Sequence, residues 1–138
     1  MRTSGILLPI FSLPNSYGIG TLGKEAYDFV DFLEKCHQTY WQVLPIGPTS
    51  YGDSPYQSFS VFAGNPYFID FDLLKEEGLL EESDYAEYLD ESLSIDYGKI
   101  YNTRYLVLRR AYSKFDIKLL KNFEKENSDW LEDFSLFM

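Results

Sequence analysis

The chain has 138 residues, the size of one ordinary domain, and 45% of them are hydrophobic, as in most globular proteins. Acidic residues outnumber basic ones by 22 to 12, which gives a net charge of −10 at pH 7. Such a charge repels nucleic acid backbones and anionic membrane surfaces, but not a neutral ligand such as a sugar. We therefore expect no nucleic acid partner and no membrane partner.

The N-terminus does not resemble a secretory signal. Its apolar run, residues 5–11, is short and is broken by Pro9. No apolar run approaches the ~20 residues that a membrane-spanning helix needs. A cytoplasmic location is the expectation.

Residues 5–8 form a compact apolar run that predicts a short buried strand, and the Gly- and Pro-rich residues 12–23 predict a loop. Residues 24–37 have helical periodicity, with one apolar face and one charged face. Residues 40–44 are apolar on both faces, as in a buried strand of a parallel sheet. Strand, helix and strand together predict a βαβ unit.

A long segment with many glycines and prolines, residues 47–66, follows the second predicted strand. A loop of this length inside a compact domain is usually functional. It lies after the carboxyl end of a strand, where α/β folds bind their ligands.

The second half of the chain has a different composition. Residues 76–96 contain nine acids and no base, which we interpret as a solvated surface. Residues 97–138 predict two or three helices, with Tyr101, Tyr105, Leu108 and Tyr112 at helical spacing. The last helical pattern stops at Met138 without a Gly cap, a Pro or a polar tail. We therefore expect the natural protein to continue.

Cysteine and histidine chemistry has little support. We expect the single cysteine, Cys36, to be a small buried side chain on a helix. His37, the only histidine, is expected at a helix end, where its cation would suit the helix dipole. One Cys and one His cannot build a typical zinc site, and we expect no metal.

The string GIGTLG at residues 18–23 fits the dinucleotide pattern G-x-G-x-x-G. Its context is wrong, because Pro14 and Asn15 separate it from the first strand and no acidic residue ends the second. The alternative is a loop that needs positive φ angles before a helix.

The string YGDSPYQS at residues 51–58 offers two aromatic rings, a carboxylate, hydroxyls and an amide. Saccharides bind through rings stacked on their CH faces and polar groups around their hydroxyls, so sugar binding is one interpretation and a structural polar turn is the other. A glycosidic site needs two carboxylates about 5 Å apart if it retains configuration. Nothing shows that Asp53, Asp70 and Asp72 converge in this way, and the alternation around residues 69–72 predicts an extended segment with both aspartates facing solvent.

Several longer strings resemble the amylomaltase or disproportionating-enzyme family, the 4-α-glucanotransferases of glycoside hydrolase family 77. The matching stretches are SGILLP at 4–9, SLP at 12–14, YGIGTLG at 17–23, YWQVLPIGPT at 40–49, YGDSPYQSFS at 51–60, FAGNPY at 62–67 and WLEDF at 130–134. The resemblance is dense over residues 4–80 and looser over residues 81–138.

The resemblance implies an α/β fold, in which this chain forms the first βαβ portion of a (β/α)8 TIM barrel, followed by the start of a mainly helical insertion. Residues 1–75 would belong to the barrel and residues 76–138 to the insertion. The implied reaction is the retaining transfer of an α-1,4-glucan segment to the 4-hydroxyl of another glucan or glucose.

The family's catalytic carboxylates would lie beyond residue 138, so no catalytic residue is assigned. The resemblance implies donor-sugar contacts for Ser54 and Tyr56. It also implies a second glucan-binding surface at Tyr51, with Tyr101 as its partner.

Malto-oligosaccharides or other α-1,4-glucans are the expected partners, together with the remainder of the natural chain, and no cofactor is expected. The alternatives are a non-catalytic malto-oligosaccharide-binding module and an inactive scaffold.

Overall fold

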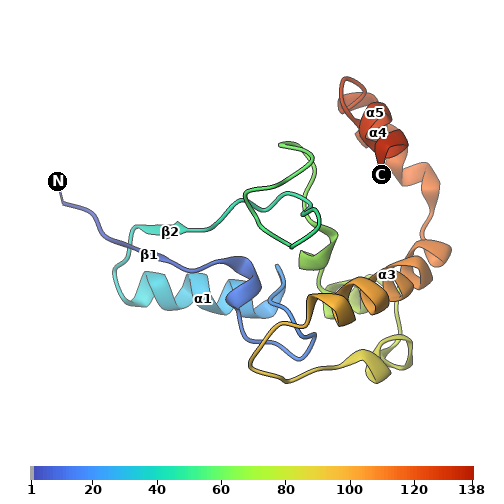
Figure 1. The fold of residues 1–138 in the computed structure, drawn as a ribbon. Helices are drawn as coiled ribbons and strands as arrows, with labels where there is room; N and C mark the ends of the chain where they lie inside the picture. Colours follow the sequence, from blue (N-terminus) through green and yellow to red (C-terminus); the bar gives the residue numbers. More distant parts are fainter. Residues whose placement is uncertain (1) are drawn as a thin grey trace.

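The computed structural model describes residues 2–138, in which short strands and helices are joined by long irregular segments (Figure 1). The strands and α-helices are β1 (Gly5–Leu7), α1 (Lys24–Lys35), β2 (Tyr40–Gln42), α2 (Phe71–Glu76), α3 (Tyr97–Lys114), α4 (Leu120–Glu126) and α5 (Leu131–Phe137). Short 3-10 helices occur at Ile10–Ser12, Pro66–Phe68, Glu82–Asp84, Ala86–Tyr88 and Ile117–Leu119. None of the helices within residues 2–138 combines the length and the apolar character that crossing a membrane demands.

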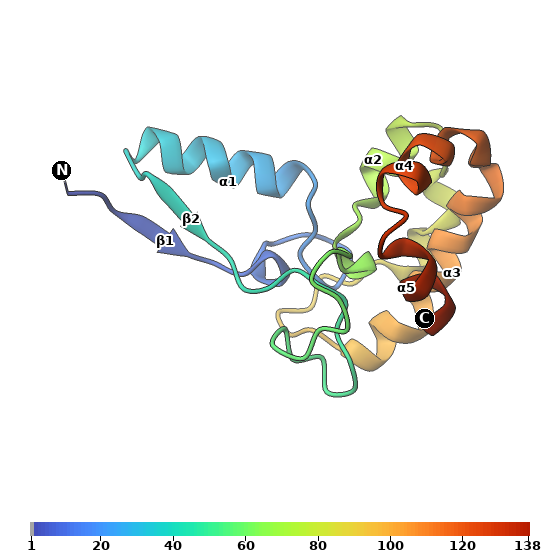
Figure 2. The ribbon, with the colours of Figure 1, turned by 90° about the horizontal axis from the view of Figure 1, so that it is seen from above.

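β1 and β2 pair in parallel, with Ile6 opposite Trp41, and α1 connects them in sequence. Figure 2 shows α1 running alongside the two strands. The indole of Trp41 donates a hydrogen bond to the carbonyl oxygen of Leu8 at 2.8 Å, and its ring packs edge-on against Phe29 of α1 at 4.9 Å. The two strands and the helix that the sequence predicts are therefore present.

The prediction that both faces of these strands are buried is wrong for this chain. Leu7, Tyr40 and Val43 are exposed, because the sheet within residues 2–138 contains two strands only. Helix α1 covers part of one face, through Phe29. A two-stranded sheet offers too little surface to bury both of its sides.

Two clusters of buried side chains form the core, and α3 contributes to both. The first cluster contains Ile10, Leu13, Ile19, Ala26, Tyr67, Phe68 and Ile100. The second contains Tyr17, Phe71, Leu80, Tyr85, Val107 and Ala111. Helix α3 therefore ties the N-terminal loop to the segment that follows α2.

The prediction that residues 69–72 are extended with two solvent-facing aspartates is wrong in two respects: α2 begins at Phe71, and only Asp72 is exposed. Asp70 is buried and caps α2, accepting hydrogen bonds from the backbone N–H groups of Asp72 and Leu73. The hydroxyl of Thr21 donates to the same carboxylate at 2.6 Å, and Asp72 accepts from the hydroxyl of Tyr85 at 2.8 Å. Asp70 is held because an Asp before a helix satisfies N–H groups that the helix leaves unpaired, whereas Asp72, inside α2, is held by Tyr85.

The glycine-rich loop before α1 has the expected left-handed backbone at Gly18, where φ is 72°. At Gly23, which caps α1, an added Cβ would collide with the Asp70 carboxylate. A carboxylate thus lies where a nucleotide site would bind pyrophosphate. The loop interpretation is favoured over dinucleotide binding.

Cys36 is exposed at the C-terminal cap of α1, so the prediction that it is buried is wrong. His37 follows it with a left-handed φ of 55°, at the helix end as predicted. The predicted helix continues only to Lys35, because the chain turns at these two residues towards β2.

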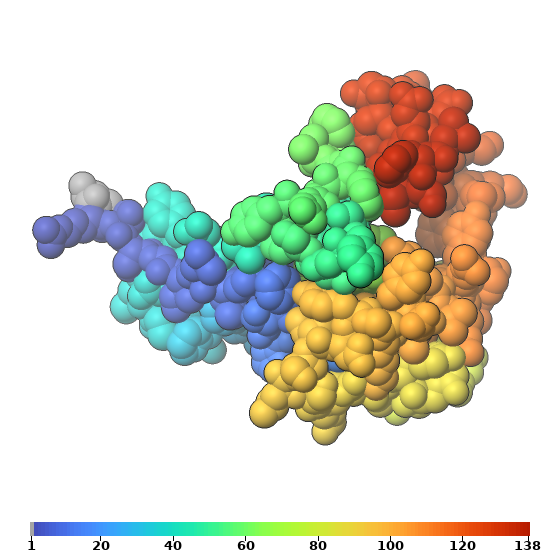
Figure 3. All heavy atoms as spheres, viewed as in Figure 1, coloured from blue at the N-terminus to red at the C-terminus, as the bar shows by residue number. Residues whose placement is uncertain are grey.

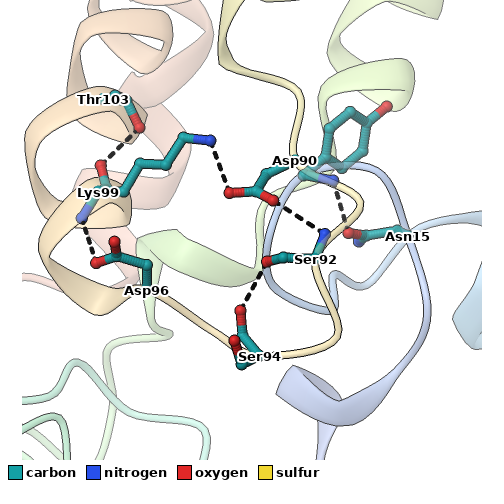
Figure 4. A network of polar contacts seen from close by, with 8 residues as sticks. Asn15, Asp90, Ser92, Ser94, Asp96, Lys99 and Thr103 are labelled. Carbon is teal, nitrogen blue, oxygen red and sulfur yellow. Dashed lines mark hydrogen bonds and ion pairs between the residues drawn. The ribbon is translucent and has the colours of Figure 1, made fainter.

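The acidic segment, residues 76–96, is held against α3 by ion pairs at some positions and is solvated at others. Asp90 pairs with Lys99 at 2.6 Å, and Asp84 pairs with Lys114 at 3.1 Å, which fastens the segment along α3. Figure 4 shows the Lys99 amino group directed at Asp90, which also accepts the backbone N–H of Ser92 at 2.9 Å. The solvated interpretation holds for exposed members such as Glu91.

Candidate functional site

The candidate site is built on the loop between β2 and the 3-10 helix Pro66–Phe68. The loop folds back on itself through an isolated antiparallel bridge between Thr49 and Ser58. Gly52 and Asp53 both have left-handed backbones, with φ of 90° and 51°. These angles form the tight turn that places Tyr51 at the tip of the loop with its side chain fully exposed.

The tip of this loop lies against the first turns of α3, as the neighbouring green and orange surfaces in Figure 3 show. A pocket of ≈ 750 Å³ opens between them, which we call the tyrosine pocket. Tyr51 and Tyr101, which were paired in the sequence prediction, both line it. The remaining lining residues are Thr49, Ser50, Gly52, Asp53, Phe59, Tyr67, Tyr97, Gly98, Tyr105 and Met138.

A chain of tyrosine rings connects the tyrosine pocket to the core. The ring of Tyr101 meets that of Tyr105 edge-on at 6.4 Å, and Tyr105 meets Tyr67 at 6.1 Å. Tyr67 is buried, and its backbone N–H donates to the side chain of Asn65 at 2.9 Å. The exposed ring of Tyr101 therefore has a fixed support behind it, which reduces the rotamer entropy lost when a ligand stacks on it.

One carboxylate faces these phenols. Burial raises the pKa of Tyr67 to about 12, with the neighbouring Tyr105 and then Asp53 contributing. Burial also raises the pKa of Tyr97, and the Asp53 charge adds to the effect. Both phenols therefore stay protonated at neutral pH and can donate hydrogen bonds to a ligand.

The other two predicted contacts, Ser54 and Tyr56, do not line the tyrosine pocket. Ser54 is half-buried, and its carbonyl oxygen accepts the backbone N–H of Gln57 at 3.0 Å. Tyr56 is largely exposed. The structure brings together two of the four predicted contact residues and leaves Ser54 and Tyr56 on another part of the loop.

No catalytic pair of carboxylates is found among the candidates. Asp70 and Asp72 are engaged in the capping and tyrosine contacts described above, and Asp53 lies in the tyrosine pocket without them. No group of three or more His, Cys, Asp or Glu side chains within residues 2–138 could hold a metal ion.

Sequence reasoning missed Tyr97 and overlooked Tyr105 as a site residue. Tyr97, Tyr101 and Tyr105 follow one another at intervals of four, which places them on one face of α3. That spacing in the sequence could have identified Tyr97 and Tyr105 as neighbours of Tyr101 in the site.

A second hollow, of ≈ 500 Å³, lies between residues 58–62 and α5. Its rings face one another: Phe62 stacks on Trp130 at 5.6 Å, and Phe59 meets Phe137 at 5.4 Å. These ring faces are already occupied, so this hollow is less suited to stacking a ligand than the tyrosine pocket.

Comparisons with known proteins agree on one family. The model of glycoside hydrolase family 77, described as 4-alpha-glucanotransferase, matches residues 8–138. The 4-alpha-glucanotransferase of Clostridium butyricum is 57% identical over 134 residues, which cover 94% of this chain and 28% of the relative. The Thermus thermophilus enzyme of the same name is 45% identical over 146 residues, again covering 28% of the relative.

A solved structure shows the same arrangement of elements. The amylomaltase from Streptococcus agalactiae in complex with acarbose superposes with a TM-score of 0.90 and 45% identity, covering 97% of this chain and 28% of that chain. The present chain thus spans a little over a quarter of the length of the proteins that it matches.

Proposed function

Because this chain belongs to glycoside hydrolase family 77, the 4-alpha-glucanotransferases, we propose that it is the N-terminal part of such an enzyme. The intact enzyme would transfer α-1,4-glucan segments to the 4-hydroxyl of an acceptor glucan or glucose, with retention of configuration. The observation that carries the proposal is the family match over residues 8–138, together with 57% identity to the Clostridium butyricum relative.

In this proposal residues 1–75 belong to a (β/α)8 barrel and residues 76–138 to a mainly helical insertion. The parallel pair of β1 and β2 joined through α1 supports the first assignment, since this is how a barrel begins. The exposed apolar side chains on both strands support it too, because further strands and helices of a barrel would cover them.

The chemistry needs two carboxylates on either side of the scissile bond, one as nucleophile and one as acid/base. We place both beyond residue 138. The role of the present residues is then to bind and orient the glucan. No organic cofactor or metal enters this reaction scheme, and a cytoplasmic location is part of the proposal.

Four residues are proposed as substrate contacts. Tyr51 and Tyr101 offer exposed rings across the tyrosine pocket, on which the CH faces of glucose units can stack. Ser54 and Tyr56 are proposed as donor-sugar contacts of the assembled barrel. The complex of the streptococcal amylomaltase with acarbose supports a saccharide-like ligand. No observation in residues 2–138 favours a non-catalytic module or an inactive scaffold over this role.

Titration of the chain with maltoheptaose by isothermal calorimetry tests the substrate contacts. Tyr101→Ala should weaken binding roughly fivefold, because a lost aromatic contact is worth about 1 kcal/mol. Tyr27→Ala is the matched control, since Tyr27 on α1 and Tyr101 on α3 are both 66% exposed and only Tyr101 lines the tyrosine pocket. Equal affinities of the two variants would refute the assignment.

A further inference from the structure

The tyrosine pocket contains a single side-chain carboxylate, that of Asp53, whose environment differs from that of the other acids near α3. Asp84 and Asp90 pair with lysines of α3. Within residues 2–138 no lysine or arginine forms an ion pair with Asp53. Its carboxylate therefore has no cationic partner at the wall of a pocket to which five tyrosines contribute.

The loop holds this carboxylate in a defined place. The hydroxyl of Thr49 donates to Oδ1 of Asp53 at 3.1 Å, and the backbone N–H of Asp53 donates to the carbonyl of Ser50 at 3.0 Å. The hydrogen bonds of residues 2–138 give Oδ2 no donor. An ionised carboxylate accepts several hydrogen bonds, so most of its accepting capacity is available to a ligand.

The turn geometry at Asp53 does not itself require a carboxylate. Its φ of 51° is left-handed, a conformation that Gly, Asn and Asp adopt more readily than most residues. Gly52, the preceding residue, shares the left-handed conformation with φ of 90°. A glycine or asparagine would satisfy the turn as well as aspartate does.

The surrounding phenols show what the carboxylate can recognise. Tyr67 and Tyr97 lie close enough for the Asp53 charge to help raise the pKa of each, after burial, which is the larger cause. They remain neutral donors, while Asp53 is an acceptor. A ligand that both donates and accepts hydrogen bonds and carries no negative charge suits this combination, and a hydroxyl-rich sugar does all three.

We propose that Asp53 is a specificity-determining residue of the tyrosine pocket, where its carboxylate accepts hydrogen bonds from hydroxyl groups of an α-1,4-glucan stacked on Tyr51 and Tyr101. This inference rests on the proposed function and adds a polar determinant to its aromatic contacts. Aromatic rings alone bind any flat apolar face. The carboxylate loses its hydrogen bonds to water when a ligand binds. A sugar replaces them with its hydroxyl groups and an apolar ring does not, so the carboxylate selects a sugar.

Calorimetric titration with maltoheptaose tests the role of Asp53 in the same chain. Asp53→Asn keeps the size, the left-handed backbone and an acceptor for Thr49, but removes the charge. It should weaken binding roughly fivefold, because hydrogen bonds to an ionised group are about twice as strong as neutral ones. Asp53→Gly keeps the backbone and removes the acceptor, and should weaken binding more than about tenfold.

Ser60→Ala is the control for an indirect effect through the loop. Ser60 lies on the same loop outside the tyrosine pocket, and the substitution removes the acceptor of the backbone N–H groups of Phe62 and Ala63 while leaving Asp53 in place, so affinity should stay within about twofold of the parent chain. If Ser60→Ala weakens binding as much as Asp53→Gly, Asp53 acts by shaping the loop, and the proposal fails.

The outcomes separate this inference from the proposed function. If maltoheptaose binds and Tyr101→Ala weakens it, but Asp53→Asn and Asp53→Gly bind like the parent, only the role of Asp53 is overturned. If the folded parent chain does not bind maltoheptaose, or Tyr101→Ala has no effect, the substrate contacts of the proposed function fail together with it.

Discussion

At the scale of single residues, Asp70 connects three segments through one buried carboxylate. It caps α2, accepts the hydroxyl of Thr21 and packs so closely on Gly23 that no Cβ fits there. Thr21 and Asp70 are only 0% and 5% exposed, so water cannot replace a lost partner easily. A buried carboxylate that loses a hydrogen bond bears an uncompensated desolvation cost.

Replacing Thr21 by Val tests this connection. The substitution keeps the β-branched shape but removes the donor to Asp70 and the acceptor of the Asn15 amide, so the free energy of unfolding should fall by about 2 kcal/mol. Thr103→Val is the matched control, because the Thr103 hydroxyl donates only to a carbonyl of its own helix at 2.8 Å and is half-buried. Urea denaturation of both variants measures the difference. A loss no larger for Thr21→Val than for Thr103→Val would contradict the account.

The prediction that Asp70 faces solvent was wrong for a physical reason. Ile69, Asp70, Phe71 and Asp72 alternate like a half-buried strand, but an Asp that starts a helix gives the same local pattern. The burial of Arg104 was equally unpredictable from the sequence. It is 2% exposed, its guanidinium lies 4.4 Å from the Phe71 ring centroid, and burial lowers its pKa to about 10. Only tertiary contacts indicate that a charged residue on a helix faces inward.

At the scale of elements, ion pairs fasten the acidic segment to α3. Asp90 makes the shortest of these contacts, and its backbone N–H also donates to the carbonyl of Ser16 in the N-terminal loop at 2.8 Å. The same residue thus joins the loop before α1 to the first turn of α3 (Figure 4). The beginning of α3 is also where Tyr97 and Tyr101 line the tyrosine pocket, so this fastening helps to position the site.

The stability of this fastening should depend on pH. Hydrogen bonds from Lys99 and then Ser92 lower the pKa of Asp90 from 3.8 to about 2 in the folded protein. Because the folded pKa lies below the unfolded one, the carboxylate contributes stability above about pH 4, and this contribution disappears as the pH falls towards 2. Asp90→Asn should therefore lower the thermal unfolding midpoint at neutral pH and converge with the parent chain near pH 2.

Glu91→Gln is the control for the pH dependence of the unfolding midpoint, because Glu91 is an exposed neighbour outside the ion pairs found in residues 2–138. Its melting curve should follow that of the parent chain at each pH. A constant difference between Asp90→Asn and the parent from neutral pH to pH 2 would show that the ion pair contributes nothing.

The helices were predictable from the sequence where periodicity was strong. The amphipathic pattern over residues 24–37 corresponds to α1, and the helical pattern after residue 97 resolves into α3, α4 and α5. The partners of these elements were not predictable, because contacts such as the ion pair of Asp84 with Lys114 join residues far apart in sequence. Composition alone described that acidic segment as a solvated surface.

At the scale of the whole molecule, the N-terminal strands contrast with the helical remainder. Figures 1 and 2 show β1, α1 and β2 extending away from the body formed by α2 to α5. The two strands leave apolar side chains and hydrogen-bonding edges uncovered within residues 2–138, an arrangement that promotes association. The family was recognisable from the sequence because long strings were preserved. The full lining of the tyrosine pocket was not recognisable, since Tyr97 and Tyr105 join it only through the packing of α3 against the loop.

We propose that this chain forms the N-terminal part of a 4-alpha-glucanotransferase whose catalytic carboxylates are supplied by other residues of the intact enzyme. The most direct test is a chimera in which residues 1–138 replace the matching part of the Clostridium butyricum relative, with which they share 57% identity over 134 residues. Glucose release from maltotriose is the measurement. We predict that the folded chimera releases glucose at a rate comparable with the relative, while the isolated chain releases none. A folded chimera without activity, or glucose release by the isolated chain, would contradict the account.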